Sequence, residues 1–330
     1  MHKGGRDNME LLRVEDLTKY FKAKKIFGAS ADVLKAVDGL ALSIPEDKVM
    51  ALVGESGCGK STVARLILNL LKPTSGTVLF RGRNIFGFNR TETKIFRKSV
   101  QIIFQDPFAS LNPRRTIYDT ISEPLLIHNL VPRSQMKDTV VDILGRVGLA
   151  PEILNRYPHE FSGGQRQRIC IARALAVSPE LIVADEPLSA LDVSIQAQIL
   201  NLLQDLKEKT RISFLFISHD LRVVKYFSDS VGVMYLGRIV EYSKTEELFG
   251  APLHPYTEVL LASVPEIRAG EEGAPRRAVL KGDVPSPINI PSGCPFHPRC
   301  PKRFGPCDKI VPSLLEHKGR PVSCHLWNPY

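Results

Sequence analysis

The sequence predicts an α/β fold with a largely parallel central sheet, an inserted helical block and a distinct C-terminal segment. Short apolar, β-branched segments alternate with amphipathic helical ones from about residue 48 to residue 245. A helix-rich block at about 116–158 interrupts this alternation. After about residue 265 the chain becomes rich in proline, glycine and charge and loses its periodicity. We therefore expect a main domain over 1–265 and an extension over 266–330.

The central sheet is expected from four short apolar runs. These runs are residues 49–54, 100–104, 181–185 and 212–218. Before them, LLRVEDLTKYF and LKAVDGLALSI read as two strands on either side of a polar loop, which predicts an antiparallel edge sheet. In the helical block, residues 117–130 and 134–147 space their apolar positions three and four apart. They predict a helical subdomain at about 106–178.

Composition restricts the class of protein without naming a partner. The chain has 330 residues, of which 43% are hydrophobic and 24% charged, as is typical of a soluble globular protein. Its apolar runs fall well short of the roughly 20 residues of a membrane-spanning helix. The first residues lack the apolar stretch of a secretory signal, so we expect the cytoplasm as its compartment. The formal charge of +9 is compatible with nucleic acid, an anionic membrane surface or a polyphosphate ligand.

The segment GESGCGKST at 54–62 lies between an apolar strand and a helix, the context that a phosphate-binding loop requires. Its glycines allow backbone amides to turn toward phosphate oxygens, and the following helix presents its positive end. Lys60 would neutralise the β and γ phosphates, and Ser61 would ligate Mg²⁺. The expected nucleotide contacts are Gly54, Glu55, Ser56, Gly57, Cys58, Gly59, Lys60, Ser61 and Thr62.

A second strand, LIVADEP at 181–187, ends in two carboxylates. Parallel α/β sheets bind ligands at this edge, so Asp185 is expected beside the metal and Glu186 beside the γ phosphate. Glu186 is the expected general base for the attacking water. The last strand delivers His219 to the same edge. A solvated strand end is the alternative interpretation of the two carboxylates.

Further motifs identify a family. FSGGQRQRICIARAL at 161–175, Gln105 in IIFQDP and SALD at 189–192 occur in a fixed order with the phosphate loop and His219. The sequence resembles the ATPase subunit of an ABC transporter over about residues 11–265. This resemblance implies a P-loop NTPase (RecA-like) core with an antiparallel β subdomain and an inserted α-helical subdomain. It also implies ATP as substrate and Mg²⁺ held by Ser61, Gln105 and Asp185.

The resemblance implies a composite site as well. Ser162, Gly163 and Gly164 of one subunit would cap the γ phosphate held by another, with Gln165 completing the motif. A helix over 162–177 would point its amides at that phosphate. Asp192 would lie between the two halves, and His219 would hold the phosphate and the water. An aromatic residue stacks on adenine in this family. Phe21 matches best, with Tyr20 or a purely structural aromatic as the alternatives.

Four of the six cysteines lie in the last 37 residues, with the spacing C-x5-C-x6-C-x16-C. This tail resembles the C-terminal extension of the oligopeptide and dipeptide importer branch, which implies a [4Fe-4S] cluster on Cys294, Cys300, Cys307 and Cys324. Structural zinc usually takes closer cysteine pairs, but Zn²⁺, with His297 or His325, stays open. Unmetallated thiols are the third alternative.

The expected function is therefore that of an ATP-hydrolysing subunit of a peptide importer at the cytoplasmic face of the membrane. The segments 109–117 and 184–203 resemble the second of the two ATPases of this branch, which implies a heterodimer, with a homodimer in isolation. Two transmembrane permease subunits and an extracytoplasmic solute-binding protein would complete the machine. Importers of nickel or oligosaccharide are the nearest alternative.

A soluble ABC ATPase acting on DNA or ribosomes is an alternative from another class. Such proteins usually carry two ATPase cores, whereas this sequence has one. It also lacks a basic stripe with interleaved aromatic residues, so nucleic acid is not an expected partner.

Overall fold

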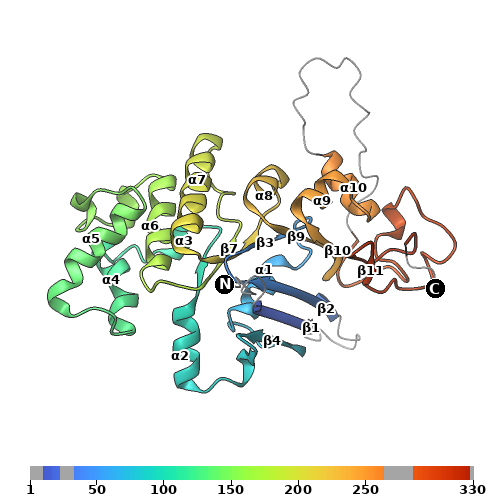
Figure 1. Cartoon of the computed structure of the whole chain (residues 1–330), viewed down its shortest axis with the longest axis horizontal. Coiled ribbons are helices and arrows are strands. Elements are labelled where there is room, and N and C mark those ends of the chain that lie inside the picture. Colours follow the sequence, from blue (N-terminus) through green and yellow to red (C-terminus); the bar gives the residue numbers. More distant parts are fainter. Residues whose placement is uncertain (1–9, 23–32, 264–284, 328–330) are drawn as a thin grey trace, which may run out of the picture.

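The computed structural model describes residues 10–22, 33–263 and 285–327. Two sheets form its centre, with the helical block at one end and the C-terminal extension at the other (Figure 1). The larger sheet has the strand order β11-β12-β10-β9-β3-β8-β7-β6, and the smaller one β2-β1-β4-β5. The expected α/β architecture is confirmed.

The large sheet contains all four strands expected from the apolar runs. Its strands are β3 (Val49–Val53), β6 (Val100–Ile103), β7 (Leu181–Asp185), β8 (Ser213–Ile217), β9 (Ser230–Tyr235), β10 (Arg238–Lys244), β11 (Leu315–His317) and β12 (Arg320–Val322). The pairs β6–β7, β7–β8, β8–β3 and β3–β9 are parallel. Burial on both faces explains why these strands are continuously apolar rather than alternating. The carboxyl ends of β3 and β7 consequently meet at one edge.

The two N-terminal strands belong to a sheet of their own. It consists of β1 (Glu10–Lys22), β2 (Val33–Pro45), β4 (Ser75–Phe80) and β5 (Arg83–Asn84), all antiparallel. The expected antiparallel sheet is confirmed, and it forms a subdomain separate from the main sheet. The buried face of β1 and β2 packs over α1 and the apolar side of the central strands in a second core cluster. The loop expected between the two strands falls on residues 23–32, outside the described residues.

The helical block lies at the left of Figure 1. Its helices are α3 (Pro107–Ser110), α4 (Ile117–Ile127), α5 (Met136–Arg146) and α6 (Gly163–Leu175), with short 3₁₀ turns at Arg133–Gln135, Pro151–Ile153 and Pro158–Glu160. Thr116 begins α4 with a capping box, in which its hydroxyl accepts from the Asp119 N–H and the Asp119 carboxylate accepts in return. The buried faces of α4, α5 and α6 join the core of the central sheet, so the block is not a separate hydrophobic unit.

The remaining helices flank the sheets. They are α1 (Lys60–Ile67), α2 (Arg90–Ser99), α7 (Val193–Thr210), α8 (Leu221–Phe227), α9 (Thr245–Gly250) and α10 (Pro255–Ala262), with 3₁₀ turns at Ile85–Gly87 and His297–Arg299 (η5). Among the residues in the described ranges, no helix combines the length and apolarity needed to cross a membrane.

The C-terminal extension continues the main sheet. Strand β12 pairs with β10 through Glu241 and Val322, and the Ser323 N–H donates to the Val240 carbonyl at 2.8 Å. Strands β11 and β12 have three residues each, too short for a periodic pattern to reveal them. The extension is thus built onto the edge of the main sheet.

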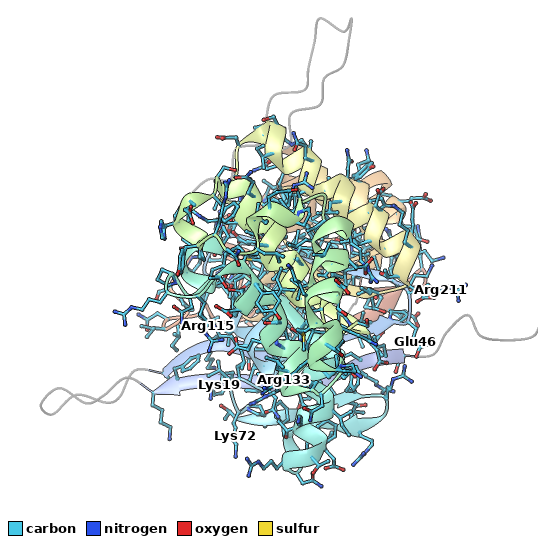
Figure 2. The ribbon with its side chains drawn as sticks, turned by 90° about the vertical axis from the view of Figure 1, so that its left-hand side faces the viewer. Lys19, Glu46, Lys72, Arg115, Arg133 and Arg211 are labelled. Atoms are coloured by element: carbon cyan, nitrogen blue, oxygen red, sulfur yellow. The ribbon has the colours of Figure 1, made fainter. Side chains whose placement is uncertain are left out.

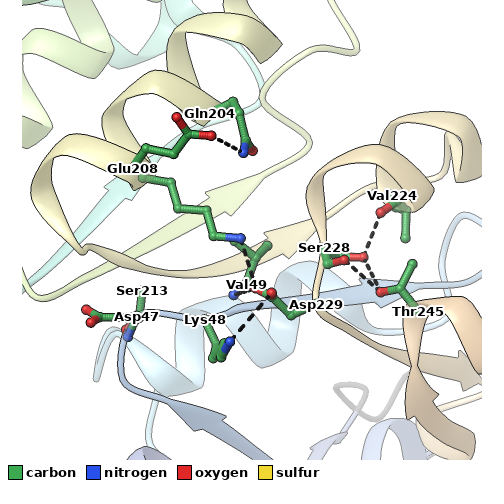
Figure 3. Close-up of polar contacts among 11 residues, drawn as sticks. Asp47, Lys48, Val49, Gln204, Glu208, Ser213, Val224, Ser228, Asp229 and Thr245 are labelled. Carbon is green, nitrogen blue, oxygen red and sulfur yellow. Dashed lines mark hydrogen bonds and ion pairs between the residues drawn. The ribbon is translucent and has the colours of Figure 1, made fainter. Parts of the chain in front are cut away.

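Asp229 fixes the start of the central strand (Figure 3). Its Oδ2 accepts from the Val49 N–H at 2.7 Å and from Lys207 Nζ at 3.0 Å. Lys48 Nζ lies 3.9 Å from Oδ1. One carboxylate therefore ties the β3 backbone to α7 at the edge opposite the phosphate loop.

The basic charge is spread over several elements. Figure 2 labels Lys19, Lys72, Arg115, Arg133 and Arg211, which come from different parts of the chain. Some are engaged locally, because Lys19 Nζ donates to the Lys72 carbonyl at 2.7 Å.

Candidate functional site

The loop between β3 and α1 has a backbone that only glycine tolerates. Gly54, Gly57 and Gly59 have φ values of +154°, +80° and +111°. A Cβ on Gly59 would lie 2.1 Å from the Ala36 carbonyl oxygen, and one on Gly54 would lie 2.2 Å from that of Met234. The loop is therefore packed tightly between β2 and β9, and its conformation is set before any ligand binds.

Lys60 and Ser61 begin α1 at the mouth of this loop. The Lys60 ammonium is almost completely buried and donates to the carbonyls of Gly54 at 2.8 Å and Glu55 at 3.0 Å. Ser61 Oγ donates to Asp185 Oδ1 at 3.1 Å. Burial raises the pKa of Asp185, and the neighbouring Glu186 carboxylate raises it further. A cation between Ser61 and Asp185 would offset the repulsion between the Asp185 and Glu186 carboxylates. The oxygens of Ser61 and Asp185 are of the kind that Mg²⁺ prefers.

Glu186 follows β7 in the left-handed region, with φ +48°, and its N–H donates to the Ile217 carbonyl at 3.0 Å. Its Oε2 accepts from Gln105 Nε2 at 3.2 Å and lies 3.3 Å from His219 Nδ1. Gln105 and His219, which follow β6 and β8, thus both contact the carboxylate of Glu186, which follows β7. All three residues were predicted from the sequence. The arrangement can hold and deprotonate a water molecule.

Lys60, Ser61, Gln105 and Glu186 line a pocket of about 280 Å³. The lining residues are Phe21, Leu34, Ala36, Ser56, Gly57, Gly59, Lys60, Ser61, Thr62, Gln105, Glu186 and Pro287. Phe21 is 37% exposed. By contrast, the Tyr20 hydroxyl bonds to Asp38, and burial together with that carboxylate raises the pKa of Tyr20 to about 12. Of the two aromatic candidates, Phe21 is therefore the one that lines this pocket.

The SGGQ segment starts α6. Ser162 is its N-cap: the Gln165 N–H donates to Ser162 Oγ at 3.4 Å, and Gln165 Oε1 accepts from the Ser162 N–H at 3.0 Å. Across the described residues, those that line the pocket include none from 162–165. Asp192 is the N-cap of α7, and its side chain makes no capping hydrogen bond. The chain's own pocket thus lacks these predicted contacts.

Two features of the site were missed by the sequence reasoning, and both come from the extension. Pro287 lines the pocket, and its carbonyl accepts from the Lys35 N–H at 3.3 Å. Arg299 forms a bidentate ion pair with Glu55 of the phosphate loop. Neither contact has a local signal, because each joins positions more than 240 residues apart.

The four C-terminal cysteines converge on a second, smaller cavity, which His254, His297 and His325 also line. None of these four cysteines forms a disulfide. Burial raises the pKa of Cys294 to about 12 and of Cys324 to about 11. However, within residues 10–22, 33–263 and 285–327 no group of three or more His, Cys, Asp or Glu side chains is arranged to hold a metal ion. The structure therefore gives the predicted cluster no support beyond the convergence of its thiols.

Known proteins resemble this chain over nearly its whole length. Residues 37–189 match the family described as ABC transporter, and residues 240–307 match that described as Oligopeptide/dipeptide transporter, C-terminal region. The chain is 49% identical to the oligopeptide transport ATP-binding protein AppF of Bacillus subtilis, covering 96% of this chain and 98% of that protein. It is 44% identical to the dipeptide transport ATP-binding protein DppF of Escherichia coli, covering 95% and 93%.

Solved structures agree with the fold. The chain is similar to cbiO1 from Clostridium perfringens, part of the ABC transporter complex cbiONQ, with a TM-score of 0.62, 28% identity and coverage of 74% and 92%. It is also similar to the dimeric post-hydrolysis structure of the ATP-binding cassette MJ0796 bound to ADP and Pi, with a TM-score of 0.63, 28% identity and coverage of 71% and 98%. The chain therefore belongs to the ABC transporter family of ATP-binding proteins, and it carries the C-terminal region of the oligopeptide and dipeptide transporters.

Proposed function

We propose that this chain binds and hydrolyses ATP as the energy-supplying subunit of an importer of oligopeptides or dipeptides. The observation that carries the proposal is the meeting of Lys60, Ser61, Gln105, Asp185 and Glu186 around one pocket beside a glycine-rich loop. The peptide cargo rests on the names of the relatives, since cargo does not enter this pocket.

The roles of the residues follow from their positions. Lys60 and the loop amides bind the β and γ phosphates, and Phe21 stacks on adenine with Pro287 at the same pocket. Ser61, Gln105 and Asp185 would hold Mg²⁺, and the ion would neutralise charge on the phosphates. Glu186 accepts the proton of the attacking water, while His219 and Gln105 keep its carboxylate oriented.

A second cassette completes the site. Ser162, Gly163 and Gly164 at the start of the 13-residue helix α6 present backbone N–H groups, which favour an anion. In the described part of the chain they do not line its own pocket. We therefore assign them to a pocket on the partner, with Asp192 at the same interface. The partner in the cell is a homologous ATPase, and two copies of this chain associate in isolation.

The membrane partners bind the helical block. A groove on α4 is lined by Arg115, Asp119, Ser122, Glu123, Leu126 and Ile127. Leu126 and Ile127 are 47% and 54% exposed, which suits an amphipathic segment of a permease subunit. Two permease subunits on the cytoplasmic face of the membrane and an extracytoplasmic solute-binding protein complete the importer.

The cysteine cavity is a candidate site for a metal, whose identity a spectrum and metal analysis would decide. Four thiols on one cavity are the donor set of a [4Fe-4S] cluster or of Zn²⁺, although the described residues do not arrange them as a metal site. An absorption spectrum and metal analysis of anaerobically purified protein distinguish the cases. Visible charge-transfer bands would support an iron–sulfur cluster, and stoichiometric zinc would support Zn²⁺. A protein with neither signal would carry unmetallated thiols.

Peptide uptake into vesicles tests the function. The chain is assembled with its second ATPase, its permease subunits and its solute-binding protein, and labelled dipeptide, oligopeptide, Ni²⁺ and oligosaccharide are offered in turn. We expect ATP-dependent uptake of peptide only, abolished by Lys60→Ala. Uptake of one of the other cargoes would overturn the peptide assignment, and uptake without ATP would overturn the energetic role.

A further inference from the structure

The C-terminal extension holds the phosphate loop through one ion pair. Arg299 Nη1 donates to Glu55 Oε2 at 2.8 Å, and Nη2 donates to Oε1 at 2.9 Å. The Arg299 side chain is 5% exposed and that of Glu55 21%. A shielded bidentate pair is stronger and more directional than a surface pair. The Glu55 side chain therefore faces the extension.

The backbone of Glu55 is fixed by the same neighbourhood. Its N–H donates to the Tyr256 hydroxyl at 3.0 Å, and Tyr256 packs against Phe296 of the extension with ring centroids 5.3 Å apart. The Glu55 carbonyl accepts from Lys60 Nζ at 3.0 Å. A shift of residue 55 would consequently move the lysine that is to bind the phosphates.

Docking alone does not explain a buried arginine at this position. Within the described part of the chain, its Nε–H is buried without a hydrogen-bond partner, which costs stability. Phe296, three residues earlier, already anchors the extension through apolar contacts with Tyr235 and Tyr256. An apolar side chain at 299 would extend that contact at a lower desolvation cost. What the guanidinium adds is orientation of Glu55 and neutralisation of a carboxylate beside a polyphosphate site.

We propose that Arg299 is a positioning residue for ATP binding, which acts from the extension by orienting and neutralising Glu55 of the phosphate loop. This inference rests on the proposed function, in which that loop binds ATP. It makes the extension a part of the nucleotide site rather than an appendage to it.

ATP affinity of the full-length chain tests the proposal, measured as the equilibrium Kd and as KM and kcat. We expect Arg299→Gln to raise Kd and KM about tenfold, the middle of the usual range of coupling between sites, with kcat at saturating ATP nearly unchanged. Arg299→Lys keeps the charge but not the fork, so its effect is intermediate. The double variant Arg299→Gln/Glu55→Gln binds ATP more tightly than Arg299→Gln, because it leaves no unpaired carboxylate beside the phosphates.

Arg303→Gln is the matched control. Arg303 lies in the same extension, but it pairs with Asp308 at 3.2 Å on the exposed surface. We expect it to bind ATP like the wild type. Thermal melting of each variant separates loss of fold from loss of affinity, and if Arg299→Gln does not fold, Arg299→Lys carries the test.

Wild-type Kd and KM in Arg299→Gln, or in Arg299→Lys if only that variant folds, would overturn the inference while leaving the proposed function intact. An equal loss in Arg303→Gln, or a double variant weaker than Arg299→Gln, would also overturn it. A wild-type chain that does not bind ATP would overturn the proposed function, and this inference with it.

Discussion

Glu186 Oε2 and His219 Nδ1 lie 3.3 Å apart, although the two residues come from the ends of different strands. Gln105 Nε2 approaches the same oxygen at 3.2 Å from a third strand. The Glu186 side chain is 16% exposed and that of His219 61%, so the carboxylate is the more shielded member of the pair. This geometry supports the proposed role of Glu186 in activating water.

Glu186→Gln tests that role. The amide keeps the size of the side chain but cannot accept a proton, so we expect ATP hydrolysis to fall by about 10²–10⁴-fold, the usual contribution of a general base. ATP affinity should change little because Lys60 and the loop are untouched. Phosphate release and nucleotide binding measure the two quantities. Hydrolysis within a few-fold of the wild type would contradict the assignment.

Phe21→Ala tests the base contact. Phe21 lines the pocket, and stacking on a base is worth about 1–3 kcal/mol, so KM for ATP should rise about tenfold without loss of thermal stability. Tyr20→Phe is the control, since it removes the hydroxyl that bonds to Asp38 but leaves the pocket lining intact. An unchanged KM in Phe21→Ala would mean that adenine binds elsewhere.

Much of this site could be predicted because its residues follow one another in short motifs. The phosphate loop, the Asp185–Glu186 pair and His219 each end a strand that is recognisable from its apolar run. The topology then brings the strand ends together. The glycines at 54 and 59 were predictable from the pattern alone, and the structure adds the reason, which is the close approach of Met234 and Ala36.

The contributions of the extension could not be predicted in the same way. Pro287 lines the pocket and contacts Lys35, and Arg299 pairs with Glu55 of the phosphate loop. Each contact spans more than 240 residues, and β11 and β12 are three-residue strands. The extension has no periodic apolar pattern from which a strand register could be predicted. The pairing of β12 with β10 is therefore known only from the structure. The convergence of the cysteines was expected, but whether their side chains ligate a metal depends on ångström-scale placement that spacing does not encode.

Asp229→Ala tests the carboxylate that ties β3 to α7. The change leaves the Val49 N–H and Lys207 without their acceptor, so we expect the free energy of unfolding to fall by about 1–2 kcal/mol. Asp205→Ala is the control, because its 3.4 Å pair with Lys209 is exposed on α7 and worth at most a few tenths of a kcal/mol. Denaturant unfolding compares them, and equal losses would count against this role for Asp229.

His254 predicts a pH dependence of stability. It is fully buried, its Nδ1 accepts from the Tyr256 N–H at 3.0 Å, and burial lowers its pKa from 6.5 to about 3. Only the unfolded chain then takes up a proton between these values. The stabilisation is complete above about pH 6.5 and is lost as the pH falls toward 3, by about 2 kcal/mol between pH 7 and 5.

His254→Asn provides the comparison. Asparagine keeps an acceptor for the helix N-terminus but lacks the ring that packs against Phe296, so this variant should be less stable at pH 7. Because asparagine does not titrate, the variant should lose less stability on acidification. The free energy of unfolding is measured for both proteins from pH 7 to pH 5. Parallel curves would contradict the assignment of this pH dependence to His254.

In the proposed dimer, the Ser162 segment of a second cassette completes the pocket that Lys60 and Glu186 line. Mixing two inactive variants measures this most directly. Lys60→Ala and Ser162→Arg are each assayed alone and at a 1:1 ratio, at a concentration where the wild-type chain hydrolyses ATP. Composite pockets predict that the mixture regains activity, since one pocket of each mixed dimer has an intact lysine and an intact serine. A mixture no more active than its two components would contradict the account.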